Sequence, residues 1–148
     1  MVKKINILFV CKHNLFRSQV ANAFFKKLNK NKKYQSYSAG IIKFNKKDLL
    51  GDDKGYEVEK KISEKYGIKL KKNSKGLSSS LLKKTNILII VADDVPSLIF
   101  KKENSFNGKI FVWKVPDVKF EDIKKEKIAF NTIEYIKKKI NKFINKLK

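Results

Sequence analysis

The sequence contains only one cysteine, one histidine, one tryptophan and two prolines among its 148 residues. A single cysteine excludes an internal disulfide and a metal site built from several cysteines, and a single histidine argues against a histidine-based metal site. Scarce cysteine suits a reducing compartment, so we expect a cytoplasmic protein. No apolar run approaches the roughly 20 residues that span a bilayer, and the short apolar stretch near the start lacks the small-residue cleavage site of a signal peptide.

Acidic residues are also scarce. The chain has 14 aspartates and glutamates but 36 lysines and arginines, which gives a net charge of +22. Such a surplus is typical of nucleic-acid-binding proteins when the basic residues are clustered. Here the lysines are spread along the whole chain, and the wealth of lysine, asparagine, isoleucine and phenylalanine indicates AT-rich codons. We therefore expect no specific nucleic-acid partner, only an attraction for anionic substrates and some non-specific polyanion binding.

Three scarce residues lie close together in the sequence. Cys11 is the only cysteine, His13 the only histidine and Arg17 the only arginine. In a chain so biased toward lysine, a single arginine indicates a site where lysine would not serve. The planar guanidinium binds phosphate through two parallel hydrogen bonds, which a lysine ammonium cannot do.

Apolar runs that are typical of buried strands alternate with segments of helical periodicity. We expect strands at residues 4–10, 34–39, 86–92 and 109–113. Helices are expected from about residue 17 to 28, from 52 or 53 to about 66, briefly around 81–82, and from 122 to 147. This alternation predicts a parallel sheet with helices on both faces, in a single domain covering residues 1–148.

Cys11 and Arg17 have the spacing C-x5-R between an expected strand and an expected helix. Five intervening residues let the backbone curl so that its N–H groups point inward and form an anion site, to which the helix N-terminus adds its positive end. The same field favours the nucleophilic thiolate. A buried structural cysteine is the alternative, which the strand–loop–helix context disfavours. The predicted phosphate-binding residues are Lys12, His13, Asn14, Leu15, Phe16 and Arg17.

The segment from Cys11 to Gln19 resembles the signature of low-molecular-weight protein tyrosine phosphatases and of the related thioredoxin-coupled arsenate reductases. Residues 38–40 (Ser-Ala-Gly) resemble the motif after the family's second strand, and residues 115–117 (Val-Pro-Asp) resemble its late acid-bearing loop. Residues 41–53 match poorly. The fold we expect is a flavodoxin-like three-layer α/β domain with a four-stranded parallel sheet in the order 2-1-3-4.

Carried over to this sequence, the resemblance implies roles for five residues. Cys11 would be the nucleophile and Arg17 the transition-state clamp. Ser18 would donate a hydrogen bond to the Cys11 sulfur and help it leave, and Asn14 would hold the shape of the loop. Asp117 would protonate the leaving oxygen and then activate the hydrolytic water. Its place just past a strand, on the rim where ligands of parallel sheets bind, favours this role over a simple turn.

Several positions depart from the family pattern. Many family phosphatases have glycine at the position of His13. Here His13 could act as a base, contact the substrate or support the loop. Many of them also have a second cysteine at the position of Phe16. We expect Phe16 to line the mouth of the pocket. The family's acid is usually followed by proline and aromatics, but of the three residues directly after Asp117 only Phe120 could wall a phenyl ring. Asp93, at the end of the third strand, is the second candidate for the acid.

These observations predict hydrolysis of a phosphomonoester, protein phosphotyrosine or an aryl phosphate, through a cysteinyl-phosphate intermediate. We expect no cofactor or metal, no membrane partner, a monomer, and inhibition by phosphate-like oxyanions. One alternative is an arsenate reductase that uses an external thiol, since the chain has no resolving cysteine. Another is a non-catalytic phosphate- or polyanion-binding module, which an intact nucleophile, clamp and acid disfavour.

Overall fold

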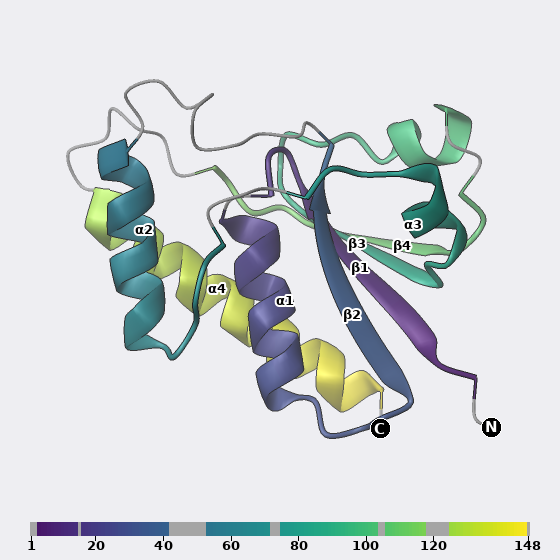
Figure 1. The fold of residues 1–148 in the computed structure, drawn as a ribbon, viewed down its shortest axis with the longest axis horizontal. Helices are drawn as coiled ribbons and strands as arrows, with labels where there is room; N and C mark the ends of the chain where they lie inside the picture. Colours follow the sequence, from purple (N-terminus) through teal and green to yellow (C-terminus); the bar gives the residue numbers. More distant parts are fainter. Residues whose placement is uncertain are drawn as a thin grey trace.

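The computed structural model describes residues 3–14, 16–41, 53–71, 75–103, 106–117 and 125–147. Its sheet is all-parallel, with the strand order β2-β1-β3-β4 (Figure 1). This order and the surrounding helices confirm the predicted flavodoxin-like α/β fold. The strands are β1 (Ile5–Cys11), β2 (Tyr34–Gly40), β3 (Ile87–Val91) and β4 (Lys109–Trp113).

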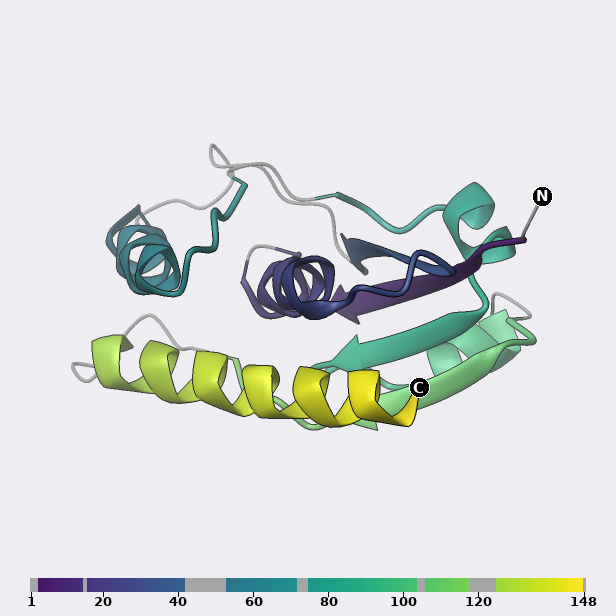
Figure 2. The same ribbon diagram turned by 90° about the horizontal axis from the view of Figure 1, so that it is seen from below.

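Two groups of helices cover the two faces of the sheet. On one face, α1 (Arg17–Leu28), α2 (Asp53–Lys65) and α4 (Lys125–Lys146) pack together, and Figure 2 shows the long α4 running past the other two. The other face carries the short α3 (Ser79–Lys83) and the π-type turn η2 (Ile99–Glu103). None of the helices in the described ranges is both long and apolar enough to cross a membrane.

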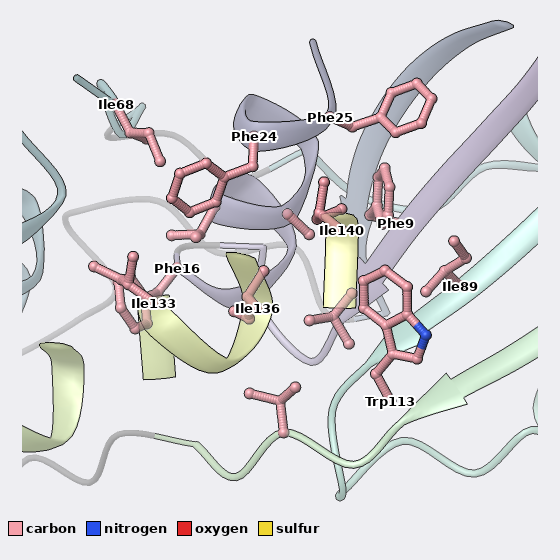
Figure 3. Packing of buried hydrophobic residues seen from close by; sticks show 14 of the residues in the cluster. Phe9, Phe16, Phe24, Phe25, Ile68, Ile89, Trp113, Ile133, Ile136 and Ile140 are labelled. Carbon is pink, nitrogen blue, oxygen red and sulfur yellow. The ribbon is translucent and has the colours of Figure 1, made fainter. Parts of the chain in front are cut away.

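Alternation along the buried strands creates a separate core on each face. Ile7 and Phe9 of β1 belong to the cluster beneath α1 and α4, whereas Leu8 and Val10 belong to the cluster beneath α3. Figure 3 shows Phe9 in the first cluster with Trp113, whose ring centroid lies 6.0 Å from its own. Successive strand side chains point to opposite faces, so the apolar run at residues 7–10 must be covered on both.

The apolar face predicted for the last helix is confirmed. The stripe from Ala129 through Ile133 and Ile136 to Ile140 is fully buried, with Ile144 packed against the same core. The described part of this helix begins at Lys125, and the expected start at residue 122 lies outside the described residues. The same is true of residues 42–52, which make up most of the segment that matches the family poorly.

Register places the functional segments at one edge of the sheet. Cys11 ends β1 directly beside Gly40 at the end of β2, and Val91 at the end of β3 pairs with Trp113 at the end of β4. Because the strands are parallel, the loops that follow them all leave from this carboxyl edge. The edge is where the sequence predicted the site.

Candidate active site

Cys11 lies at the end of β1 and is only 2 % exposed. Its Sγ is 3.1 Å from Ser18 Oγ and accepts a hydrogen bond from the Asn14 backbone N–H at 3.2 Å. The loop therefore curls back over the sulfur, as the C-x5-R spacing predicts.

Asn14 holds the loop in an unusual backbone conformation. Its φ of 58° lies in the left-handed region, which asparagine tolerates better than most residues. Its side-chain Nδ2 donates to Ser18 Oγ at 2.6 Å, and its Oδ1 accepts from the Lys75 backbone N–H at 2.8 Å. The family resemblance implied that the Asn14 side chain holds the shape of the loop. Its two hydrogen bonds, to α1 and to the segment before α3, would serve this role.

Gln19 braces the same loop from α1, and the sequence alone assigned it no role. Its buried Nε2 donates to the Asn14 carbonyl at 2.7 Å and to the Lys71 carbonyl at 3.1 Å. Its Oε1 accepts from the Lys71 backbone N–H at 2.6 Å. One amide thereby ties the loop to the chain that follows α2. In the sequence, only the position of Gln19 directly after Ser18 indicated that its side chain could support the loop.

Gly40 lets the loop approach β2. A Cβ at this position would lie 2.6 Å from the His13 carbonyl carbon, 2.7 Å from the Asn14 nitrogen and 3.0 Å from the Lys12 oxygen. All three are backbone atoms, so a side chain at this position would displace the loop. Gly40 also donates to the Lys75 carbonyl at 2.8 Å, which fixes its own position. The Ser-Ala-Gly motif thus has a physical reason for its glycine.

Arg17 begins α1 and is 2 % exposed. Its Nη1 donates to the Val115 carbonyl at 2.9 Å and to Asp94 Oδ1 at 3.1 Å, and its Nη2 lies 3.5 Å from Asp94 Oδ2. Asp93 lies farther away, with Oδ1 at 4.0 Å from Nη1. Asp93 was the second candidate for the acid, but its neighbour Asp94 is the closer partner of Arg17 in the fold.

Asp117 also faces Arg17, with its Oδ1 3.8 Å from Nε. Its side chain is 46 % exposed, so it is open to substrate and water. Burial lowers the pKa of His13 below its ordinary 6.5; Asp117 and Asp94 oppose this shift, and Lys12 and Arg17 reinforce it. His13 is therefore mainly neutral at pH 7 and lies in the same field as the predicted acid.

The remaining predicted phosphate-binding residues differ in their placement. Lys12 and His13 are half-buried in the loop. Phe16 is 4 % exposed and belongs to the core beneath α1 and α4, so the expectation that it lines the pocket mouth is wrong. Its apolar ring gains more from that core than from a polar rim. Leu15 and Phe120 lie outside the described residues.

A cysteine under converging donors, a buried arginine and an open carboxylate form the arrangement of a cysteine-dependent phosphatase. The described side chains include no group of three or more histidine, cysteine, aspartate or glutamate residues placed to hold a metal ion. Residues 6–148 match the family model of low molecular weight phosphotyrosine protein phosphatase, so the chain belongs to that family. A comparison with curated proteins finds no match.

Solved structures with the same fold come from several organisms. The YwlE arginine phosphatase from Geobacillus stearothermophilus has 17 % identity and a TM-score of 0.75, over 97 % of this chain and 92 % of that one. A low molecular weight protein tyrosine phosphatase from Streptococcus pyogenes has 19 % identity and a TM-score of 0.71, over 97 % and 93 %. An arsenate reductase from Archaeoglobus fulgidus has 20 % identity and a TM-score of 0.60, over 91 % and 98 %.

Proposed function

We propose that this protein hydrolyses protein phosphotyrosine or another aryl phosphate through a cysteinyl-phosphate intermediate on Cys11. The observation that carries the proposal is the convergence of three groups at one sheet edge. The sulfur of Cys11 accepts from the Asn14 backbone N–H and lies 3.1 Å from Ser18 Oγ. Arg17 begins the helix that follows the loop, and Asp117 Oδ1 lies 3.8 Å from its guanidinium. Binding alone needs no nucleophile, so this set favours catalysis over a phosphate-binding module.

In the first step the Cys11 thiolate attacks phosphorus in line with the ester oxygen. An S–P bond forms while the P–O bond to the alcohol breaks, and Asp117 transfers its proton to the departing oxygen. Arg17 binds two equatorial oxygens through its planar fork, for which it must exchange contacts with Asp94. The inward N–H groups of the loop stabilise the negative charge on the transferring group.

In the second step a water attacks the cysteinyl phosphate. Asp117, now a carboxylate, accepts the proton from this water, the S–P bond breaks, and inorganic phosphate leaves. Ser18 Oγ, 3.1 Å from the sulfur, donates a hydrogen bond to the departing thiolate. Neither step needs a metal, because the loop, Arg17 and Asp117 together handle the charge and the protons.

The test is turnover of para-nitrophenyl phosphate by the wild-type protein and by Cys11→Ser. We expect the wild type to turn over and the variant to be inactive, yet still to bind vanadate, since its loop and Arg17 are unchanged. Turnover by Cys11→Ser would refute the cysteinyl-phosphate step. Faster hydrolysis of a phosphoarginine peptide than of a phosphotyrosine peptide would refute the aryl substrate but keep the intermediate.

Arsenate reduction is tested in a second assay on the same protein. With one cysteine in the chain, a Cys11–arsenate adduct has no internal thiol to resolve it. Reduction would therefore need glutathione or a second thiol protein. The external thiolate attacks Cys11 Sγ, the S–As bond breaks, and arsenic leaves as arsenite with the electron pair. A second external thiol then reduces the mixed disulfide left on Cys11. We expect slow or no reduction with thioredoxin as sole reductant. Efficient turnover under that condition, exceeding aryl phosphate hydrolysis, would favour the reductase.

A further inference from the structure

The acidic residues of this chain are not spread as its lysines are. Residues 1–47 contain no aspartate or glutamate, and neither do residues 135–148. At the carboxyl edge of the sheet, in contrast, Asp93, Asp94 and Asp117 surround Arg17. The protein therefore has acidic side chains grouped around Arg17 and two long stretches without a negative charge, the first of which extends beyond the active-site loop to the other end of the sheet.

Parts of these two stretches lie together at the end of the molecule opposite the active site. The loop from α1 to β2 lies at the amino ends of the parallel strands, and the carboxyl end of α4 lies beside it (Figure 1). β1 is seven residues long, so this end is about 20 Å from Cys11. Lysines distant in sequence become neighbours only through this topology.

Two adjoining cavities open at this end, and we call them together the amino-end groove. The first has a volume of about 530 Å³, and its described lining includes Lys4, Lys26, Lys30 and Lys32. The second has about 540 Å³, and its described lining includes Leu28, Ile144 and Leu147. Residues 29–31 line both. No described residue lining either cavity is acidic. The lysines make the first cavity cationic, and the second presents three apolar side chains beside residues 29–31.

We propose that the amino-end groove docks a linear segment of a partner protein that carries acidic residues beside one apolar side chain. The four lysines are exposed and uncompensated by any acidic neighbour in the described lining, so they complement carboxylates. The apolar cavity beside them accepts a leucine-sized side chain, which contributes affinity and register. A short segment reaches both because the cavities share residues 29–31.

The lining favours a peptide over single-stranded nucleic acid. Proteins that bind single-stranded nucleic acid without sequence preference use exposed aromatic faces on which bases stack. Phe25 is 1 % exposed, Tyr34 is half-buried against the core, and the Tyr37 ring already carries the Lys84 ammonium 4.1 Å from its centroid. Bases would also leave the Leu28–Ile144–Leu147 cavity unused. The docking site does not depend on the chemistry at Cys11, because binding is measurable without turnover.

The experiment measures fluorescence anisotropy of a short labelled peptide of alternating glutamate and glycine with one central leucine. We expect binding that weakens about fivefold or more in Lys30→Glu/Lys32→Glu, because attraction becomes repulsion at two contacts. The matched control is Lys61→Glu/Lys138→Glu, the same charge change at exposed positions on α2 and α4 outside both cavities. It should weaken binding less than about twofold. Far-UV circular dichroism shows that each variant is folded.

A second peptide with serine in place of the leucine should bind about tenfold more weakly, as expected for loss of one buried apolar side chain. Equal binding of the two peptides, equal losses in the two double variants, or no binding at all would overturn the proposal. So would a single-stranded RNA of matched charge that binds more tightly than the leucine peptide and is weakened selectively by Lys30→Glu/Lys32→Glu. That last result would assign the groove to nucleic acid.

Discussion

Both carboxylate oxygens of Asp94 accept hydrogen bonds from the guanidinium of Arg17, at 3.1 Å from Nη1 and 3.5 Å from Nη2. The Val115 carbonyl accepts from the same Nη1 at 2.9 Å. The arginine begins α1, whereas its two partners follow β3 and β4. Three segments of the chain therefore set the direction of the Arg17 side chain, and in the proposed mechanism phosphate must compete with the Asp94 carboxylate for its guanidinium.

This competition predicts the effect of Asp94→Asn. The amide keeps the shape and one acceptor but removes a negative charge beside the incoming dianion. We expect inorganic phosphate to inhibit the variant at concentrations roughly three- to tenfold lower than the wild type, as partly exposed charges allow. Asp94→Ala should share this gain but lose kcat, because the guanidinium loses its support. Weaker phosphate inhibition in both variants would mean that Asp94 acts only by positioning Arg17.

Asp117→Asn tests the general acid. Without a proton to donate, the variant should slow esters with basic leaving groups, such as phenyl phosphate, about 100-fold or more. It should slow para-nitrophenyl phosphate much less, since that leaving oxygen needs little protonation. Measuring kcat over a series of leaving groups reveals the difference in slope. Asp93→Asn is the control, and a steeper slope in that variant would transfer the acid role to Asp93.

Gly40→Ala tests the close approach of the loop to β2. The new methyl would meet backbone atoms of His13 and Asn14 at 2.6 and 2.7 Å, so the loop must move. We expect about 1–3 kcal/mol lower stability and a large fall in kcat/KM.

Gly108→Ala provides the comparison, because its Cβ would meet the Asn86 oxygen and the Phe106 ring, both at 2.5 Å, at the other end of the sheet. This variant should lose a similar amount of stability, measured by urea unfolding, and keep its kcat. If the two variants lost activity equally, the loop contact would have no special importance.

The single histidine allows a direct test of the site's electrostatics. Burial lowers the pKa of His13 in the folded protein, so between that value and the ordinary 6.5 the unfolded chain binds a proton that the folded one does not. Stability should therefore fall as pH drops below 6.5. His13→Gln should remove this part of the fall in Tm between pH 7.5 and 5.5. One imidazole NMR titration gives the pKa, and a value above 6.5 would mean that Asp117 and Asp94 outweigh burial.

Local patterns were sufficient to predict the sheet and the loop. The first β–α unit is specified by the apolar run at residues 7–10, the C-x5-R turn and a helix with Val20, Ala21, Phe24 and Phe25 on one face. Near neighbours suffice to encode this hydrophobic periodicity. The strand order and the rim position of Asp117 followed from the resemblance and the rules for parallel sheets.

Contacts between distant segments were decided only by the tertiary structure. The pairing of Asp94 with Arg17, the two-way bond of Gln19 to Lys71 and the packing of Phe16 in the core depend on which side chains meet after the sheet closes. The same holds for the amino-end groove, whose lysines look evenly spread along the chain. Sequence by itself determines which segments become strands and helices, but hydrogen bonds and charge interactions act over a few ångströms. Only the packed fold sets those distances.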